Sequence, residues 1–183
     1  IVVAAGGNGS LLKRLSAKGI HTVEIPNMVR DISPFTDLRV FMFLLELIKA
    51  KNPQILHLNS SKAAILGSLA GRLRGVPNIV FTVHGWPFSE RRMLLSRFFF
   101  FAISWVTAML SHKIIAVSRS DAKAVSFFPM VNKSKISIIH NGISSIALAE
   151  RNPARIALQR FLSNPIPVDD FWIGTVGELN KNK

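Results

Sequence analysis

The sequence predicts an α/β fold, a doubly wound parallel sheet covered by helices on both faces. Short apolar runs typical of buried strands alternate with segments of helical spacing, which is the pattern of parallel strands joined by crossover helices. The composition is 49% hydrophobic with a mean hydropathy of +0.32, which excludes a disordered chain. The absence of cysteine excludes disulfide frameworks, zinc–thiolate sites and cysteine nucleophiles.

The expected strands share short, continuous apolar cores bounded by turn-forming or polar residues. In chain order they are Ile1–Ala5, His21–Ile25, Gln54–Leu58, Asn78–His84, Lys113–Val117, Ile136–His140 and Phe171–Gly177.

The expected helices lie between these strands and begin or end at recognisable signals. Ser33 and Ser118 are N-cap residues, and Pro34 suits the first helical position. Gly19 and Gly75 suit the position after a helix end. In order, the helices are Ser10–Lys18, Pro34–Lys51, Ser61–Arg74, Arg91–Ser111, Arg119–Phe128 and Pro153–Leu162.

Both ends of the chain are expected to be cut, and the chain to be a fragment of a longer protein. No methionine precedes the first strand, and another strand is expected just before Lys183. No signal peptide fits the start, because no basic segment precedes an apolar core. Residues Asn164–Asp170, rich in proline and acid, are typical of a linker.

Polar residues gather where the expected strands end, and ligands of open α/β sheets bind outside the carboxyl ends of the strands. His84 ends an apolar run and is followed by Gly85, which permits close backbone approach; we expect a functional role there. His57 lies inside a strand and is expected to be a packed, satisfied core histidine. The remaining strand-end residues are Ser60, Ser61, Lys62, Ser118, Arg119, Asn141 and Gly142.

Structural explanations stand beside the functional ones. Ser60 or Ser61, and Ser118, are also suited to cap helices. Asn141-Gly142 is a common turn dipeptide. The loop at residues 6–9 resembles a phosphate cradle but does not match the known glycine-rich motifs. Acidic residues are few and scattered, so no metal site is expected.

The net charge of +13 indicates an anionic partner: nucleic acid, a phosphate-bearing ligand or an anionic membrane. Residues Phe98–Leu110 carry no charge, but a membrane-spanning helix needs about 20 apolar residues. This helix is therefore either buried against the sheet or inserted in a membrane interface. The second interpretation is favoured by Arg91, Arg92 and Arg97, which lie just before the run.

Several segments together resemble the amino-terminal half of a GT-B glycosyltransferase of the large nucleotide-sugar-dependent, retaining family (glycosyl transferases group 1, family four). Within that family, the similarity is greatest to bacterial enzymes that build cell-surface polysaccharide on a lipid carrier. The segments are HLNSSKAAILGSLAGRLRGVP (57–77), VFTVHGWPF (80–88), KIIAVSRSD (113–121), ISIIHNGIS (136–144) and IGTVGELNKNK (173–183).

The resemblance implies two Rossmann-like domains facing a cleft. Residues 1–168 would form the acceptor-binding domain without its first strand, and residues 169–183 the linker and first strand of the donor-binding domain. His84 would contact the transferred sugar as the catalytic histidine. Substrate would be bound by Gly85, Ser60, Ser61, Lys62, Ser118, Arg119, Asn141 and Gly142. Lys183 would meet the donor diphosphate, whereas Glu178 stands where the family has arginine.

The resemblance implies a hexosyltransferase that moves a sugar from a nucleotide diphosphate-sugar to an acceptor hydroxyl with retention. The acceptor would be a lipid-linked or cell-surface polysaccharide precursor, and no cofactor or metal is expected in this fragment, which alone would be inactive. The protein would be cytoplasmic and peripheral on the inner face of the plasma membrane. The alternative is a basic nucleic-acid-binding domain, but no helix-turn-helix, RNP or zinc pattern is present in the sequence.

Overall fold

The structure is a computed structural model that describes residues 1–7, 9–29, 31–89, 93–143, 145 and 147–174. The chain divides into two units, Ile1–His140 and Asn141–Lys183.

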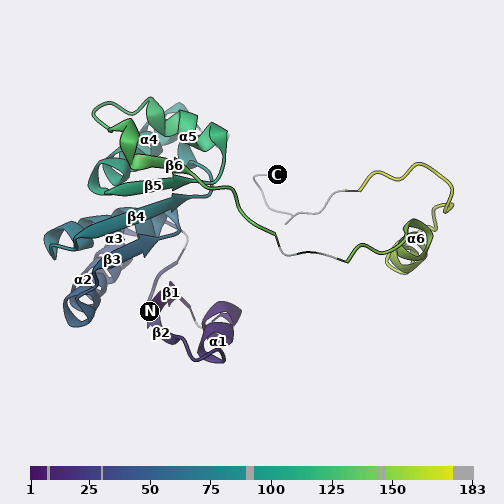
Figure 1. Cartoon of the computed structure of the whole chain (residues 1–183), viewed down its shortest axis with the longest axis horizontal. Coiled ribbons are helices and arrows are strands. Elements are labelled where there is room, and N and C mark those ends of the chain that lie inside the picture. The colour runs from purple at the N-terminus through teal and green to yellow at the C-terminus, as the bar shows by residue number, and fades with distance from the viewer. Residues whose placement is uncertain (8, 30, 90–92, 144, 146, 175–183) are drawn as a thin grey trace. The chain divides into compact units, whose positions relative to one another are not determined.

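The first unit is built from parallel strands joined by helices (Figure 1), which confirms the predicted α/β class. Its elements are β1 (Val2–Gly6), α1 (Ser10–Ser16), β2 (His21–Ile25), α2 (Pro34–Lys51), β3 (Ile55–Leu58), α3 (Ser61–Leu73), β4 (Asn78–Val83), η1 (Pro87–Ser89), α4 (Leu94–Leu110), β5 (Lys113–Ala116), α5 (Arg119–Ser126), η2 (Lys133–Lys135) and β6 (Ile136–Ile138).

The strands form two sheets where one was expected. One sheet contains β1 and β2, and the other has the order β3-β4-β5-β6, with every pairing parallel. Among the described residues, β1 pairs with β2 alone and β3 with β4 alone, so each keeps one edge without a strand partner. The parallel pairing confirms the predicted fold class, whereas the division of the strands into two sheets was not predicted, because alternation in sequence specifies strands but not which edges meet.

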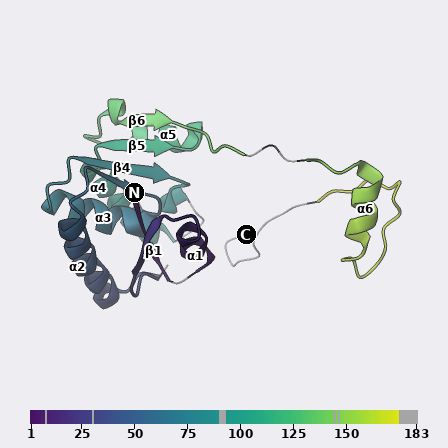
Figure 2. The same cartoon turned by 60° about the horizontal axis from the view of Figure 1, so that its bottom comes forward.

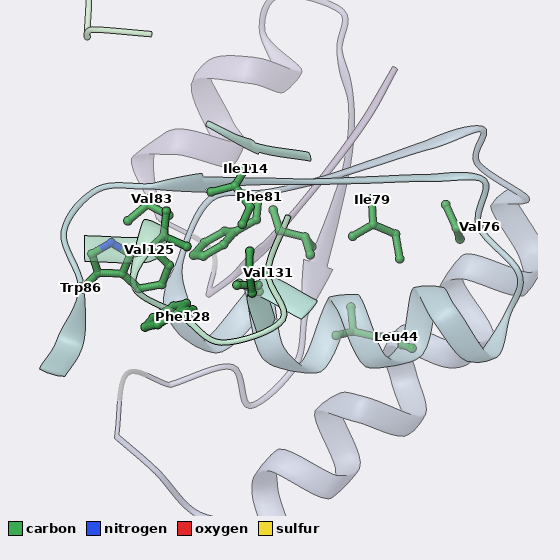
Figure 3. Packing of buried hydrophobic residues seen from close by; sticks show 14 of the residues in the cluster. Leu44, Val76, Ile79, Phe81, Val83, Trp86, Ile114, Val125, Phe128 and Val131 are labelled. Atoms are coloured by element: carbon green, nitrogen blue, oxygen red, sulfur yellow. The ribbon is translucent and has the colours of Figure 1, made fainter. Parts of the chain in front are cut away.

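The main hydrophobic core lies on one face of the four-stranded sheet. Figure 3 shows Ile79, Phe81, Val83 and Ile114 between the strands and the helices that pack below them. Helix α2 packs against α3, and α3 against α4. Strand β4 is the most buried of the strands: Ile79 is 0% and Val83 1% exposed.

Small residues on α3 allow this helix to approach the sheet closely. A Cβ atom on Gly67 would lie 2.5 Å from Cδ2 of Leu58, and one on Gly71 would lie 3.0 Å from side-chain carbons of Leu56 and Ile79. Both glycines are buried. The positions therefore select glycine for space and not for backbone conformation.

The carboxyl end of α4 is held by two basic side chains. Arg72 Nε donates to the carbonyl of Leu110 at 2.7 Å, and Lys135 Nζ donates to the carbonyls of Ser111 at 3.1 Å and Met109 at 3.3 Å. The last carbonyls of a helix have no partner within the helix, and cations also complement its dipole there. The end of α4 is therefore fixed to α3 and to the η2 segment.

The second unit contains α6 (Arg151–Gln159) and the segment after it (Figure 2). The guanidinium of Arg155 lies 5.1 Å from the ring centroid of Trp172. Residues 171–174 are not in a strand, so the strand expected at Phe171–Gly177 is wrong over its described part. The rest of that prediction lies outside the described residues.

Candidate functional site

A cleft of about 720 Å³ lies at the carboxyl ends of β3 and β4. Three loops line it: the one after β2, the β3–α3 junction, and the turn after β4. Its lining residues are Met28, Val29, Asp31, Ile32, Asn59, Ser60, Ser61, Lys62, Phe81, Thr82, His84, Gly85, Pro87 and Phe100. Of the predicted site residues, the structure thus brings together Ser60, Ser61, Lys62, His84 and Gly85.

His84 is the first residue after β4, which ends at Val83. Its side chain is exposed and lines the cleft, and no described residue is hydrogen-bonded to its imidazole. The imidazole is therefore available both to donate and to accept a hydrogen bond with a ligand. Gly85 follows with a φ of 109°, a conformation that other residues rarely adopt. This turn directs the chain away from the sheet directly after His84.

The β3–α3 junction both caps α3 and lines the cleft. The Ser60 side chain accepts a hydrogen bond from the amide of Ala63 at 3.3 Å and is the N-cap of α3. Lys62 forms an ion pair with Asp37 of α2, with 2.7 Å between Nζ and Oδ1, and also donates to the carbonyl of Asp31. With side chains 14% and 17% exposed, this pair is largely shielded from water. Lys62 therefore ties the loop after β2 to α3 at the cleft wall.

Ser118 and Arg119 lie at the end of β5, but they are not among the residues that line the cleft. The Ser118 hydroxyl accepts from the amide of Asp121 at 3.0 Å and donates to its carboxylate at 2.5 Å. The predicted cap of α5 is thus confirmed. Asn141 and Gly142 belong to the second unit, whereas Glu178 and Lys183 lie outside the described residues.

The prediction that His57 is a packed, satisfied core histidine was wrong in part. The histidine is satisfied, because its Nε2 lies 2.8 Å from Oγ1 of Thr82, but it is exposed and does not pack in the core. The reason is its alternation with Leu58. Leu58 points toward the helices of the core, so His57 points to the opposite face of β3.

The cleft loop after β2 was missed by sequence reasoning. Met28, Val29, Asp31 and Ile32 line the cleft, yet three of these four are apolar and gave no polar signal. The rule that ligands meet the carboxyl ends of strands would have found the loop, because it directly follows β2. Phe100, contributed by α4, has no sequence signal that separates it from its apolar neighbours.

A second cavity of about 290 Å³ lies next to the cleft, between α3 and α4. We call it the apolar chamber. Six residues line both cavities: Ile32, Ser61, Lys62, Phe81, Pro87 and Phe100. The other lining residues of the chamber are Asp37, Ile65, Leu66, Trp86, Phe99, Ile103, Ser104 and Thr107. Its lining is therefore largely aliphatic and aromatic, whereas the lining of the cleft mixes polar and apolar residues.

Helix α4 is neither wholly buried nor wholly exposed. Its second half packs inward through Ser104, Thr107 and Ala108. Its first turns expose large apolar side chains: Leu94 is 82%, Leu95 81% and Phe98 71% exposed. No helix in the described part of the chain is long and apolar enough to cross a membrane. Within those same residues, no cluster of histidine, aspartate or glutamate could hold a metal ion.

Comparison with known proteins gives a family match. The family model described as Glycosyltransferase Family 4 matches residues 1–145. The chain is 32% identical over 119 residues to the Escherichia coli UDP-Gal:alpha-D-GlcNAc-diphosphoundecaprenol alpha-1,3-galactosyltransferase, covering 65% of the chain and 31% of that enzyme. It is 24% identical over 181 residues to the capsular polysaccharide biosynthesis glycosyltransferase CapM of Staphylococcus aureus, covering 96% of the chain and 45% of that protein. The chain thus spans less than half the length of these curated relatives.

Solved structures share the fold. Anabaena HepE, in complex with UDP and glucose, matches with a TM-score of 0.63 and 15% identity over 86% of the chain and 42% of that protein. A Rickettsia africae glycosyltransferase matches with a TM-score of 0.57 and 22% identity over 78% of the chain and 35% of that protein. A Listeria monocytogenes protein described as a UDP-N-acetylglucosamine 2-epimerase also matches, with a TM-score of 0.57 and 15% identity over 74% of the chain and 35% of that protein. The fold alone therefore does not separate transferases from epimerases.

Proposed function

Because this chain belongs to glycosyltransferase family 4, we propose that it forms the acceptor-binding part of a retaining hexosyltransferase. The enzyme moves a sugar from a nucleotide diphosphate-sugar to a hydroxyl of a lipid-linked or cell-surface polysaccharide precursor. The relatives named for a diphosphoundecaprenol-linked acceptor and for capsular polysaccharide support this substrate class. The observation that carries the proposal is the cleft at the carboxyl ends of β3 and β4, with an available imidazole at its edge.

In this proposal, residues 1–168 are the acceptor domain, and residues 169–183 lead into a donor-binding domain. The greater length of the curated relatives supports a second domain. The free edges of β1 and β3 support a further strand before Ile1, since one strand hydrogen-bonded to both edges would join the two sheets into one. A longer protein that includes this strand is expected to melt at a higher temperature than the 183-residue chain.

His84 contacts a hydroxyl of the transferred sugar in this proposal. Its exposure, its position at the end of β4 and the turn at Gly85 support that role. Ser60, Ser61 and Lys62 shape the acceptor side of the same cleft. Lys62 acts there mainly by positioning, because its ammonium group is already paired with an aspartate.

Substrate is also proposed to be bound by Ser118, Arg119, Asn141 and Gly142, and the donor diphosphate by Lys183. The leaving group is a nucleoside diphosphate, and negative charge develops on it as the glycosidic bond breaks. Backbone amides at helix starts and cationic side chains stabilise such charge. The start of α5 at Arg119 offers both kinds of group.

Peripheral attachment to the inner face of the plasma membrane is the proposed location. The exposed apolar side chains at the start of α4 support it, together with the net charge of +13. A helix end that presents apolar side chains near basic ones binds anionic lipid surfaces. Attachment would bring the cleft close to a lipid-linked acceptor.

The test is sugar transfer by the full-length protein. A set of nucleotide diphosphate-sugars would be incubated with a polyprenyl diphosphate-linked sugar, and the product linkage would be read by NMR. Transfer that requires the lipid-linked acceptor, with the donor's anomeric configuration kept, supports the proposal. Inversion at the anomeric carbon refutes the retaining mechanism. Absence of transfer with every donor, together with tight binding of nucleic acid, refutes the proposed function and favours the nucleic-acid-binding alternative.

A further inference from the structure

We propose that the apolar chamber between α3 and α4 binds the first part of a polyisoprenoid chain, the lipid portion of the acceptor. This inference rests on the proposed function, which supplies the lipid-linked acceptor. It adds a binding site in this chain for the hydrocarbon itself. The site is separate from membrane insertion of the exposed residues of α4, because the chamber lies between helices and not on their outer surface.

The shared wall of the two cavities is the first argument. Phe81, Pro87 and Phe100 are among the residues that line both the cleft, which also carries polar side chains, and the apolar chamber. A molecule with a polar head and an apolar chain can therefore occupy both cavities at once. A free sugar or nucleotide would leave the chamber unused, because such ligands have no apolar part to bury there.

The lining of the chamber is the second argument. Its wall includes Ile65 and Leu66 of α3, Phe99 and Ile103 of α4, and Trp86. The polar groups present are largely satisfied: the hydroxyl of Thr107 donates to the carbonyl of Ile103 at 2.8 Å. The Lys62 ammonium and the Asp37 carboxylate pair with each other. The chamber thus presents apolar surface and little free hydrogen-bonding capacity, as a hydrocarbon ligand requires.

The route to the chamber is the third argument. Phe99 lines it and is also 49% exposed, and the neighbouring Phe98 is 71% exposed. Apolar side chains therefore continue from the chamber to the outer surface of α4. A chain whose far end stays in the membrane could leave the chamber along these phenylalanines without crossing polar surface.

The size of the chamber limits what it holds. At about 290 Å³, it is just below the roughly 300–1,000 Å³ typical of small-ligand pockets. It therefore holds only the part of the chain nearest the diphosphate. Each additional buried methylene strengthens binding about fourfold. Affinity should rise with chain length until the chamber is full and then level off.

Trp86 is a built-in reporter for this site. It lines the chamber but not the cleft, and it is 4% exposed. The chain contains three tryptophans, so Trp105→Phe together with Trp172→Phe leaves Trp86 as the sole emitter. The probe is farnesyl diphosphate brominated in its last isoprene unit, used below its micellar concentration, because bromine quenches indole fluorescence only at short range.

We expect saturable quenching of Trp86 in the 183-residue chain. Unbrominated farnesyl diphosphate should compete, geranyl diphosphate should compete at least tenfold more weakly, and inorganic diphosphate should not compete. Three results would overturn the proposal: no saturable quenching, competition by inorganic diphosphate at the same concentrations as farnesyl diphosphate, or equal quenching by dibromostearate, which would indicate an acyl-chain site.

Two pairs of substitutions locate the site. Ile65→Phe narrows the chamber and Ile103→Asn makes it polar; each should weaken quenching at least tenfold. Their controls lie about one turn further along the same helices and outside the chamber: Leu69→Phe, at a side chain 40% exposed, and Val106→Asn, at one 39% exposed. The controls should change binding less than twofold. The site would be refuted if quenching weakened equally in the variants and their controls. It would also be refuted if quenching did not weaken in chamber variants that still melt cooperatively.

The two proposals fail separately. Sugar transfer by the full-length protein tests the function, whereas quenching is an equilibrium measurement that needs neither donor nor turnover. Transfer without chamber binding would refute only the polyisoprenoid site. Chamber binding without transfer would refute only the proposed function.

Discussion

Replacing the exposed apolar side chains at the start of α4 should release the full-length protein from membranes. Leu94 and Phe98 are four residues apart, so they lie on the same side of the helix. They are 82% and 71% exposed. Full burial of a leucine or phenylalanine contributes roughly 1.5–3 kcal/mol. Scaled by exposure, insertion of both contributes roughly 2–5 kcal/mol, so Leu94→Ser with Phe98→Ser should weaken partitioning at least about 30-fold.

The assay is co-sedimentation with vesicles that contain anionic lipid, measured over a range of lipid concentrations. Phe127→Ser is a matched control, because Phe127 is also 71% exposed but lies at the end of α5. It should leave binding unchanged. If the control weakens binding as much as the double variant, or if the double variant binds like the wild type, insertion of α4 is refuted.

The electrostatic part of the same attachment is tested with salt. Each basic residue near an anionic surface contributes about 1 kcal/mol. Replacing Arg91, Arg92 and Arg97 with glutamine should therefore release the protein at moderate ionic strength, where the wild type remains bound. Of these three, Arg97 is described, and its Nε donates to the carbonyl of Phe88 at 3.3 Å. If the wild type and the triple variant sediment equally, or if neither protein sediments, a membrane role for the arginines is excluded.

Four further predictions concern activity and stability. His84→Ala should lower turnover of the full-length enzyme at least tenfold with an unchanged melting temperature, because its side chain is exposed; unchanged turnover would make His84 structural. The 183-residue chain should show no transfer with any nucleotide-sugar, and measurable turnover would contradict the two-domain proposal. Ile79→Ala, at a side chain 0% exposed, should cost about 2–5 kcal/mol of unfolding free energy by urea titration, whereas Ile55→Ala, at one 62% exposed, should cost far less. The pKa of His112 lies below its ordinary value of 6.5, first because of burial and then because of the charges of Arg72 and Lys135. Its Nδ1 accepts a hydrogen bond from the Ile79 amide at 2.9 Å. The contribution of neutral His112 to the free energy of unfolding should therefore be complete above pH 6.5 and decline as the pH falls below 6.5. A His112→Asn variant whose stability has the same acid sensitivity would contradict this.

The order of strands and helices could be predicted because each has a strong local signal. Ser33 with Pro34 marks the start of α2, and Ser118 marks the start of α5. The separation of the sheets could not be predicted. Whether β1 and β3 pair with each other depends on contacts between strands far apart in the chain, and the local sequence does not specify such contacts. The strand expected at residue Phe171 failed for a related reason. An apolar run becomes a strand only when a neighbouring strand is present to pair with it.

The candidate site was predictable where a polar residue directly follows a strand. That rule placed His84 in the cleft, and Lys62 was found because the polar segment after β3 continues into the first turn of α3. It did not identify Asp37 as the partner of Lys62, because the two are separated by 25 positions along the chain and their contact depends on how α2 packs on α3. His57 was placed in the core because its neighbours are apolar. Its exposure follows from the face of β3 on which it lies, which the apolar run does not reveal.

The cations at the carboxyl end of α4 make the two ends of that helix unequal in local stability. Carbonyls at Met109, Leu110 and Ser111 are bound by side chains from outside the helix, whereas the first turn has no side-chain cap. Local opening should therefore begin at the amino end, where few apolar contacts hold the backbone. Amide hydrogens of α4 should exchange with solvent fastest near Phe98 and slowest near Ala108. The helix thus combines a fixed end in the protein interior with an end that can adjust to what lies outside it.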